Sequence, residues 1–258
     1  AVGAEYEDGA GTGIDSPLGD GATDSGAAYV FVRKEGRWTQ QAYIKAGNAE
    51  AGDLFASVTL SSDGNTLAVG APGEDSASNV IGSGQSDNSL EDVGAVYVFT
   101  RTGTTWTEQA YIKASNSGDG DSFGSIVRLS MDGDTLAVSA PSEDSAATGI
   151  GGNQSDDTAP VSGAAYVFTR SGNTWGQQTY IKASNTNGGD RFGHSLGLSS
   201  DGNTLAVGAY KEDSGATGIN GNQADNGQQN AGAAYVFTRV NGTWSQEVYL
   251  KASNTNLD

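Results

Sequence analysis

The sequence predicts an all-β protein built from four repeated antiparallel units, and three observations carry this prediction. A hexapeptide of the form Gly-Ala-Ala/Val-Tyr-Val-Phe recurs in steps of 68, 69 and 69 residues, starting at Gly26, Gly94, Gly163 and Gly232. Between these hexapeptides, segments rich in Val, Tyr, Phe, Thr and Trp alternate with clusters of Gly, Asn, Asp and Ser, as antiparallel strands alternate with their turns. No segment has the spacing of apolar residues that a helix needs.

Each repeat is predicted to hold four strands in a meander. In the last repeat these strands are 191–198, 204–209, 232–239 and 243–251. Asp201-Gly202-Asn203 separates the first two strands and Asn241-Gly242 the last two, and these residue types tolerate the positive φ of a tight hairpin. A repeated unit of four antiparallel strands predicts a β-propeller of about four blades of about 69 residues rather than a solenoid, whose coils are shorter.

The same register of repeats covers the whole chain. It predicts a single repeat domain over 1–258, with an incomplete repeat at 1–49 and further repeats at 50–118, 119–187 and 188–258. Four full copies need 276 residues and the chain has 258, so the first repeat lacks its first strand. Three explanations stay open: blades outside this sequence, a strand donated by another molecule, or a three-stranded blade with an exposed edge.

Two short motifs that recur along the chain resemble the FG-GAP repeat of integrin alpha subunits and of many bacterial surface proteins. Phe123-Gly124 and Phe192-Gly193 match the FG element, Phe55-Ala56 is a variant of it, and Gly70-Ala71-Pro72 is a full GAP. The resemblance implies a propeller, with the missing strand of the first blade being its FG strand, and an extracellular location on the cell surface or after secretion. The calcium loop of integrin-type repeats has no counterpart here, because the corresponding turns carry only one or two carboxylates; we interpret Asp63, Asp132 and Asp201 as turn residues.

The charge balance excludes several classes of partner. With 13 Lys and Arg against 31 Asp and Glu, the formal net charge is −18, which disfavours binding to nucleic acid or to anionic lipid. No apolar run approaches the roughly 18 residues of a membrane helix, so no membrane insertion is expected. A ligand should therefore be neutral or cationic.

The residue types that usually carry catalysis are scarce, so the chain is predicted not to be an enzyme. It has no cysteine and one histidine, His194, which lies on a predicted strand where the preceding repeat has Ser125. The aromatic residues fall almost entirely on recurring columns, which favours packing between blades. Tyr6 and Tyr210 are off these columns and follow the second strand of their repeats.

The long connection between the second and third strands, about 22 residues in every repeat, carries a fixed acidic pattern. Counted from the final Ala of the second strand, it has Glu at +3, Asp at +4, Ile at +10 and Asp at +16. The paired aspartates either cap turns or gather oxygen ligands for Ca²⁺, and both interpretations stay open. The candidate metal ligands are Asp8, Asp20, Asp75, Asp87, Asp144, Asp156, Asp213 and Asp225.

These observations lead to three functional hypotheses. The first is a non-enzymatic extracellular propeller module for adhesion or ligand binding, stabilised by calcium if the loops bind it, whose partner is a protein or polysaccharide at the cell surface. The second is a structural subunit of an extracellular filament or polymer, in which copies of the chain complement the missing strand. The third, a glycan-active propeller enzyme, rests on carboxylate pairs that no motif singles out.

Overall fold

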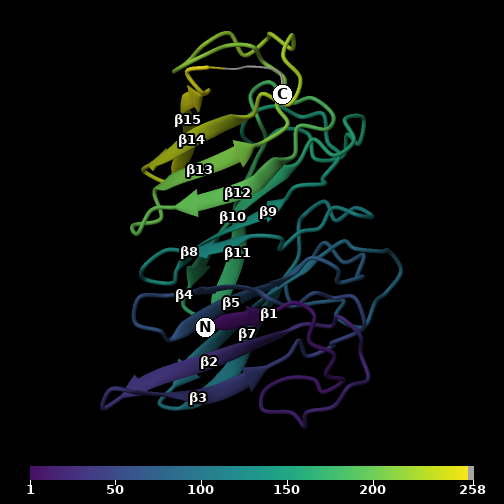
Figure 1. Cartoon of the computed structure of the whole chain (residues 1–258), viewed down its shortest axis with the longest axis vertical. Coiled ribbons are helices and arrows are strands. Elements are labelled where there is room, and N and C mark those ends of the chain that lie inside the picture. The colour runs from purple at the N-terminus through teal and green to yellow at the C-terminus, as the bar shows by residue number, and fades with distance from the viewer. Residues whose placement is uncertain (255–258) are drawn as a thin grey trace.

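The computed structural model describes residues 1–254, and these form four antiparallel sheets that confirm the predicted propeller blades (Figure 1). The first sheet has three strands, β1 (Val2–Ala4), β2 (Ala27–Lys34) and β3 (Arg37–Ile44). The second has β4 (Ser57–Leu60), β5 (Thr66–Ala71), β6 (Ala95–Thr102) and β7 (Thr105–Ile112). The third has β8 (Val127–Leu129), β9 (Thr135–Ala140), β10 (Ala164–Ser171) and β11 (Thr174–Ile181). The fourth has β12 (Phe192–Leu198), β13 (Thr204–Ala209), β14 (Ala233–Val240) and β15 (Thr243–Leu250).

Every sheet is a meander in which neighbours in sequence are neighbours in the sheet. The hairpin turns follow the predicted chemistry: Asn241 and Gly242 both have positive φ, 51° and 81°, as a two-residue turn of this hand requires. Asp201 accepts hydrogen bonds from the Ser199 hydroxyl and from the Asn203 N–H, and this holds the pKa of its carboxyl down at about 2. The predicted FG strand is shortest in the third sheet, where β8 begins only after Phe123-Gly124.

The four sheets follow one another along the long axis of the molecule (Figure 1). β2 and β3 lie at one end and β14 and β15 at the other, so the described blades form an open row and the first does not meet the last. Among the described residues no helix has the length and apolar character needed to cross a membrane.

The core consists of three apolar clusters, one at each boundary between consecutive sheets. At the first boundary, small and branched residues of the first sheet, such as Val30 and Ile44, pack against Phe55, Tyr97 and Phe99 of the second. The Phe55 ring meets the Tyr97 ring edge-on at 5.4 Å between centroids. The recurring aromatic columns therefore pack between blades, as predicted from their repetition.

The first sheet departs from this prediction because no sheet precedes it among the described residues. Trp38 is 67% exposed and Phe31 38%, whereas the equivalent Trp106 and Phe99 of the second sheet are 3% and 0% exposed. The same residue type in the same column is thus a core residue or a surface residue according to whether a neighbouring sheet covers it.

Consecutive sheets are also joined by backbone hydrogen bonds. At the second boundary the Phe123 N–H donates to the Val93 carbonyl and the Ser122 N–H to the Asp92 carbonyl, which places Gly94 in a parallel bridge with Phe123. The long connection of one blade thereby holds the segment that leads into the FG strand of the next.

Candidate functional site

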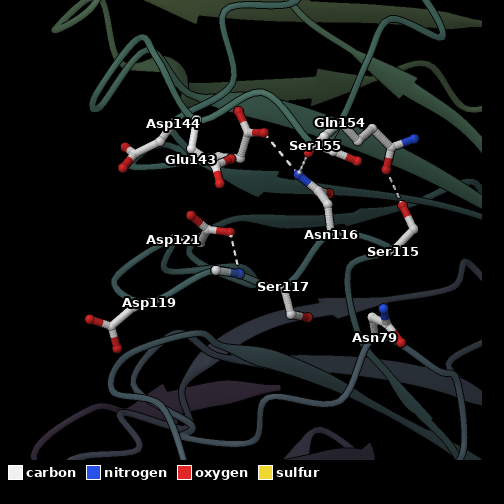
Figure 2. Close-up of a pocket in the computed structure, with 12 residues that line it drawn as sticks. Asn79, Ser115, Asn116, Ser117, Asp119, Asp121, Glu143, Asp144, Gln154 and Ser155 are labelled. Atoms are coloured by element: carbon white, nitrogen blue, oxygen red, sulfur yellow. Dashed lines mark hydrogen bonds between the residues drawn. The ribbon is translucent and has the colours of Figure 1, made fainter.

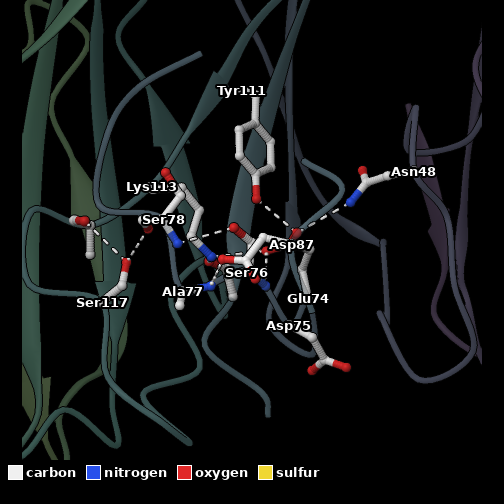
Figure 3. A network of polar contacts seen from close by, with 12 residues as sticks. Asn48, Glu74, Asp75, Ser76, Ala77, Ser78, Asp87, Tyr111, Lys113 and Ser117 are labelled. Carbon is white, nitrogen blue, oxygen red and sulfur yellow. Dashed lines mark hydrogen bonds and ion pairs between the residues drawn. The ribbon is translucent and has the colours of Figure 1, made fainter. Parts of the chain in front are cut away.

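Beneath the long connections, each blade contains a buried lysine bound to a glutamate, which is itself buried in the second, third and fourth blades. In the second blade, Glu74 Oε2 lies 2.8 Å from Lys113 Nζ, and Glu74 Oε1 accepts a hydrogen bond from the Tyr111 hydroxyl at 2.7 Å (Figure 3). Lys113 also donates to the Gly94 carbonyl at 2.6 Å. Burial lowers the pKa of Lys113, against the opposing effect of the Glu74 charge. The +3 glutamate of the sequence pattern is therefore part of the blade interior.

The network recurs in all four blades. The ion pairs are Glu7–Lys45, Glu74–Lys113, Glu143–Lys182 and Glu212–Lys251, with N–O distances of 2.6–2.8 Å. An asparagine of the preceding blade joins the glutamate from the second blade onward, as when Asn116 Nδ2 donates to Glu143 Oε1 at 2.9 Å. Sequence reasoning found the glutamates as a recurring column, but only the tertiary structure pairs them with the lysines.

The +4 aspartates close the long connections. Each accepts a hydrogen bond from a backbone N–H 16 or 17 residues later, at a residue with positive φ: Asp8 from Asp24, Asp75 from Asp92, Asp144 from Val161 and Asp213 from Asn230. The distances are 2.7–2.9 Å. This is the turn chemistry that the sequence offered as one alternative.

Three of the +16 aspartates also bind backbone N–H groups. Asp87 accepts from Ala77 at 3.2 Å, Asp225 from Gly215 at 3.1 Å and Asp156 from Thr158 at 3.2 Å, while Asp20 is exposed in its loop. The +10 isoleucine lies against the last strand of its own sheet in three of the blades, where Ile14 bridges Ile44, Ile150 bridges Ile181 and Ile219 bridges Leu250.

The candidate calcium ligands do not form a ready coordination sphere. Within residues 1–254, no group of three or more Asp, Glu or His side chains is arranged to hold a metal ion. Ca²⁺ takes six to eight oxygen ligands, and the +4 carboxylates already use an oxygen for a backbone N–H. Calcium binding by the paired aspartates stays a prediction that this donor set fits poorly.

An acidic cavity of about 510 Å³ lies at the boundary between the second and third blades (Figure 2). Its lining residues are Asn79, Ser115, Asn116, Ser117, Gly118, Asp119, Asp121, Glu143, Asp144, Gln154, Ser155 and Asp157. Figure 2 shows the acidic side chains Asp119, Asp121, Glu143 and Asp144 on one side. It shows the amide and hydroxyl side chains Ser115, Asn116, Gln154 and Ser155 on the other. We call this cavity the acidic pocket.

Asp121 is the most unusual titratable group of the acidic pocket. Burial raises the pKa of Asp121 to about 7, and the negative charges of Glu143 and Asp144 add to this effect. The Gly118 N–H, which donates to Asp121 Oδ2 at 2.8 Å, opposes it. No Lys, Arg or His lines the pocket, so its surface offers negative charge and hydrogen-bond acceptors to a ligand. The equivalent Asp53 and Asp190 also have pKa values raised to about 7 by burial.

Sequence reasoning missed the acidic pocket because its residues come from two blades. A signal was present in the sequence, since Asp53, Asp121 and Asp190 precede the FG residues at the same offset in three repeats.

The two tyrosines outside the recurring columns, Tyr6 and Tyr210, are 71% and 44% exposed. The ring of His194, on β12, packs against the ring of Tyr210 at 4.2 Å between centroids, with the two planes tilted by 40°. The single histidine therefore belongs to an exposed aromatic pair at the end of the fourth sheet, away from the acidic pocket.

A model of the FG-GAP repeat matches residues 38–99, 106–168 and 175–237. Each match begins in the last strand of one sheet and ends in the third strand of the next, so the matched unit includes one boundary between blades. No curated protein matches the sequence. One solved structure that resembles it is that of a hypothetical selenium-binding protein from Sulfolobus tokodaii, with 7% identity and a TM-score of 0.41. The similarity covers 80% of this chain but only 44% of that protein.

Proposed function

Because the chain belongs to the FG-GAP repeat family, we propose that it is a non-enzymatic extracellular module that binds a protein or polysaccharide at the cell surface. The acidic pocket between the second and third blades is the proposed binding site. The observation that carries this proposal is the composition of that pocket, which combines five carboxylates with amide and hydroxyl groups and has no basic side chain.

The chemistry of the pocket defines the ligand that it suits. Carboxylates and carbonyl oxygens accept hydrogen bonds, and a buried carboxyl with a raised pKa gains from a nearby positive charge. The ligand therefore presents amino or hydroxyl groups, as an amino-sugar polymer or a lysine-bearing protein surface does. The net charge of −18 adds long-range attraction for such a ligand.

A non-enzymatic role is supported by the way in which the chain uses its acidic residues. The glutamates of the long connections are bound to lysines inside the blades, and the +4 aspartates to backbone N–H groups. An extracellular location is supported by the family, whose repeats are typical of extracellular and surface proteins.

Calorimetric titration of the chain with an oligomer of glucosamine, and with its N-acetylated counterpart, tests the proposed ligand class. We expect the glucosamine oligomer to bind more tightly, and Asp121→Asn combined with Asp157→Asn to weaken binding at least tenfold. Asp63→Asn combined with Asp201→Asn, which removes two carboxylates from hairpin turns outside the pocket, is the matched control. Equal affinity of the pocket variant and the control for the oligomer would place binding elsewhere.

The same titration with Ca²⁺ tests the calcium prediction separately. Variants Asp213→Asn and Asp225→Asn alter one pair of candidate ligands in the fourth blade and leave the acidic pocket unchanged. A calcium stoichiometry that is one site lower in these variants than in the wild type would support a metal role, and a wild type that gives no signal would leave these aspartates with the turn role alone.

The alternative function, a polymer subunit joined by a donated strand, is favoured by one observation. Among the described residues, β1 pairs only with β2, so its other edge lacks the strand that the FG segment supplies in the three other sheets. A peptide with the sequence of residues 188–200, which contain the FG segment of the fourth sheet, should bind this edge. Failure of that peptide to bind at millimolar concentration would count against strand donation.

A further inference from the structure

The three internal boundaries between blades share one design. At each boundary, a face of small and branched residues on one sheet packs against a face of aromatic residues on the next. We call these the forward face and the rear face. In the first sheet the forward face includes Val30 and Ile44, and in the second sheet the rear face includes Tyr97, Phe99 and Trp106.

A β-bulge places one polar residue of every forward face toward the next blade. In the first sheet, Val30 pairs with Ala42 and Phe31 with Gln40, which leaves Gln41 unpaired in the ladder. Gln41 Oε1 accepts hydrogen bonds from Arg101 Nη1 at 2.9 Å and from Trp106 Nε1 at 3.2 Å.

The same arrangement, a bulged glutamine that accepts hydrogen bonds from an arginine and a tryptophan of the next blade, occurs at the other two boundaries. We call it the glutamine clamp. Gln109 accepts from Arg170 and Trp175 at 3.2 and 3.0 Å, and Gln178 accepts from Arg239 and Trp244 at 2.8 and 2.9 Å. These hydrogen bonds from arginine and tryptophan to a bulged glutamine are therefore common to all three internal boundaries.

At the two ends of the described row, one rear face and one forward face have no neighbouring sheet packed against them. On the rear face of the first sheet, Trp38 and Phe31 are exposed. On the forward face of the fourth sheet, Ala206 is exposed, whereas the equivalent Ala68 and Ala137 are fully buried. Ile219 of the same face is 71% exposed.

The forward end face carries a charge that the internal forward faces lack, and this charge is complementary to one on the rear end face. The bulge recurs in the fourth sheet, where Val236 pairs with Val248 and Phe237 with Gln246, but the bulged residue is Glu247 instead of glutamine. The residue of the first sheet that corresponds to Arg101 is Arg33, which is exposed and pairs in the ladder with Trp38. In the glutamine clamp, Glu247 has the position of the acceptor and Arg33 the position of a donor. A hydrogen bond between two oppositely charged groups is stronger than one to a neutral amide oxygen.

We propose that two copies of this chain associate head to tail, the forward face of the fourth sheet of one copy packing on the rear face of the first sheet of the other. In this contact Glu247 accepts hydrogen bonds from Arg33 and Trp38 of the second copy. The three internal boundaries supply the template, and the contact is heterologous, so it repeats until a ring closes or a filament grows. This interface is independent of the ligand site in the acidic pocket.

We expect the contact between copies to be weaker than an internal boundary, because it lacks one element that every internal boundary has. Inside the chain, the FG segment of the following blade contributes a phenylalanine to each boundary, such as Phe55 at the first. The first sheet has no such strand among the described residues, so the contact between copies relies on its remaining three strands. We therefore expect association at micromolar or higher concentration.

Sedimentation velocity over a range of concentrations tests the proposal with charge-reversal variants. The wild type should form dimers or larger species, and Glu247→Arg and Arg33→Glu should each raise the dissociation constant at least tenfold, because like charges then meet. An equimolar mixture of the two variants should associate again, since each new contact pairs opposite charges. Glu91→Arg, the same charge change on an exposed residue away from both faces, should leave association unchanged.

Two outcomes overturn the proposal. One is a wild-type chain that stays monomeric at every concentration tested, which would mean that a second copy does not occupy these faces. The other is association that responds equally to Glu247→Arg and to Glu91→Arg, which would place the contact elsewhere on the surface. Circular dichroism of each variant separates loss of association from loss of folding.

Discussion

Lys113 and Glu74 form an ion pair with 0% and 1% of their side chains exposed and 2.8 Å between Nζ and Oε2. Glu74 also accepts a hydrogen bond from Asn48 of the preceding blade at 3.2 Å. The long connection provides the glutamate, and the residue directly after the last strand is the lysine, so the pair fixes that connection to its blade. It also links the blade to the one before it.

Removing the charge of Glu74 should be strongly destabilising. Glu74→Gln leaves Lys113 charged and buried without its counter-ion, and we expect a loss of about 3–5 kcal/mol in the free energy of unfolding, measured by urea denaturation. Asp134→Asn is the control, since it breaks an ion pair with Arg170 in which the aspartate is 53% exposed. Such a pair contributes about 0–1 kcal/mol. Similar losses in both variants would contradict the role of the buried pair.

Asp121 should make the stability of the chain fall as the pH rises. The folded carboxyl has a pKa of about 7, above the ordinary 3.8, so between these values the folded state holds a proton that the unfolded state has lost. Stability due to this group is therefore highest at low pH and declines until the pH passes about 7. Asp121→Asn should be more stable than the wild type at pH 8, and this advantage should shrink toward pH 4.

The difference between variant and wild type isolates Asp121 from the other acidic groups. Asp119→Asn, which changes an exposed neighbour of Asp121, is the control. An Asp121→Asn variant whose stability relative to the wild type is constant from pH 4 to pH 8 would refute the raised pKa.

Gly94 should tolerate no side chain. Its φ is +87°, and a Cβ added there would lie 2.0 Å from the Phe123 carbonyl oxygen of the next blade. Gly232 has the same column position and a φ of +72°, but its added Cβ would come no closer than 3.2 Å to Tyr210 O. Gly94→Ala should therefore cost about 1–3 kcal/mol more in unfolding free energy than Gly232→Ala, by overpacking. Equal thermal shifts in the two variants would show that the blades separate easily at this boundary.

Substitution by alanine should reduce the free energy of unfolding much more at Trp106 than at Trp38. Trp106→Ala opens a cavity in the boundary between the first and second blades and removes a donor to Gln41, and we expect a loss of about 3–5 kcal/mol. Trp38→Ala removes an exposed ring and should cost less than about 1 kcal/mol in dilute solution. Denaturant titrations at low protein concentration, where copies do not associate, give both values. Comparable losses would mean that the first sheet is covered in solution.

The sequence by itself determined the blade. Asn241-Gly242 and similar turns, alternating strand residues and a repeat of about 69 residues depend on local backbone geometry, and local geometry is readable along the chain. The strands predicted at 204–209 and 243–251 were accordingly found at Thr204–Ala209 and Thr243–Leu250.

Only the tertiary structure decided how blades meet and what each acidic residue does. Glu74 and Lys113 are 39 residues apart, and the lining of the acidic pocket comes from two blades, so neither arrangement has a local signature. Trp38 and Trp106 cannot be distinguished by their column, because burial depends on whether another sheet lies against them. Repetition specifies a unit and its two faces, whereas contact between units in space sets the burial, charge and chemistry of each copy.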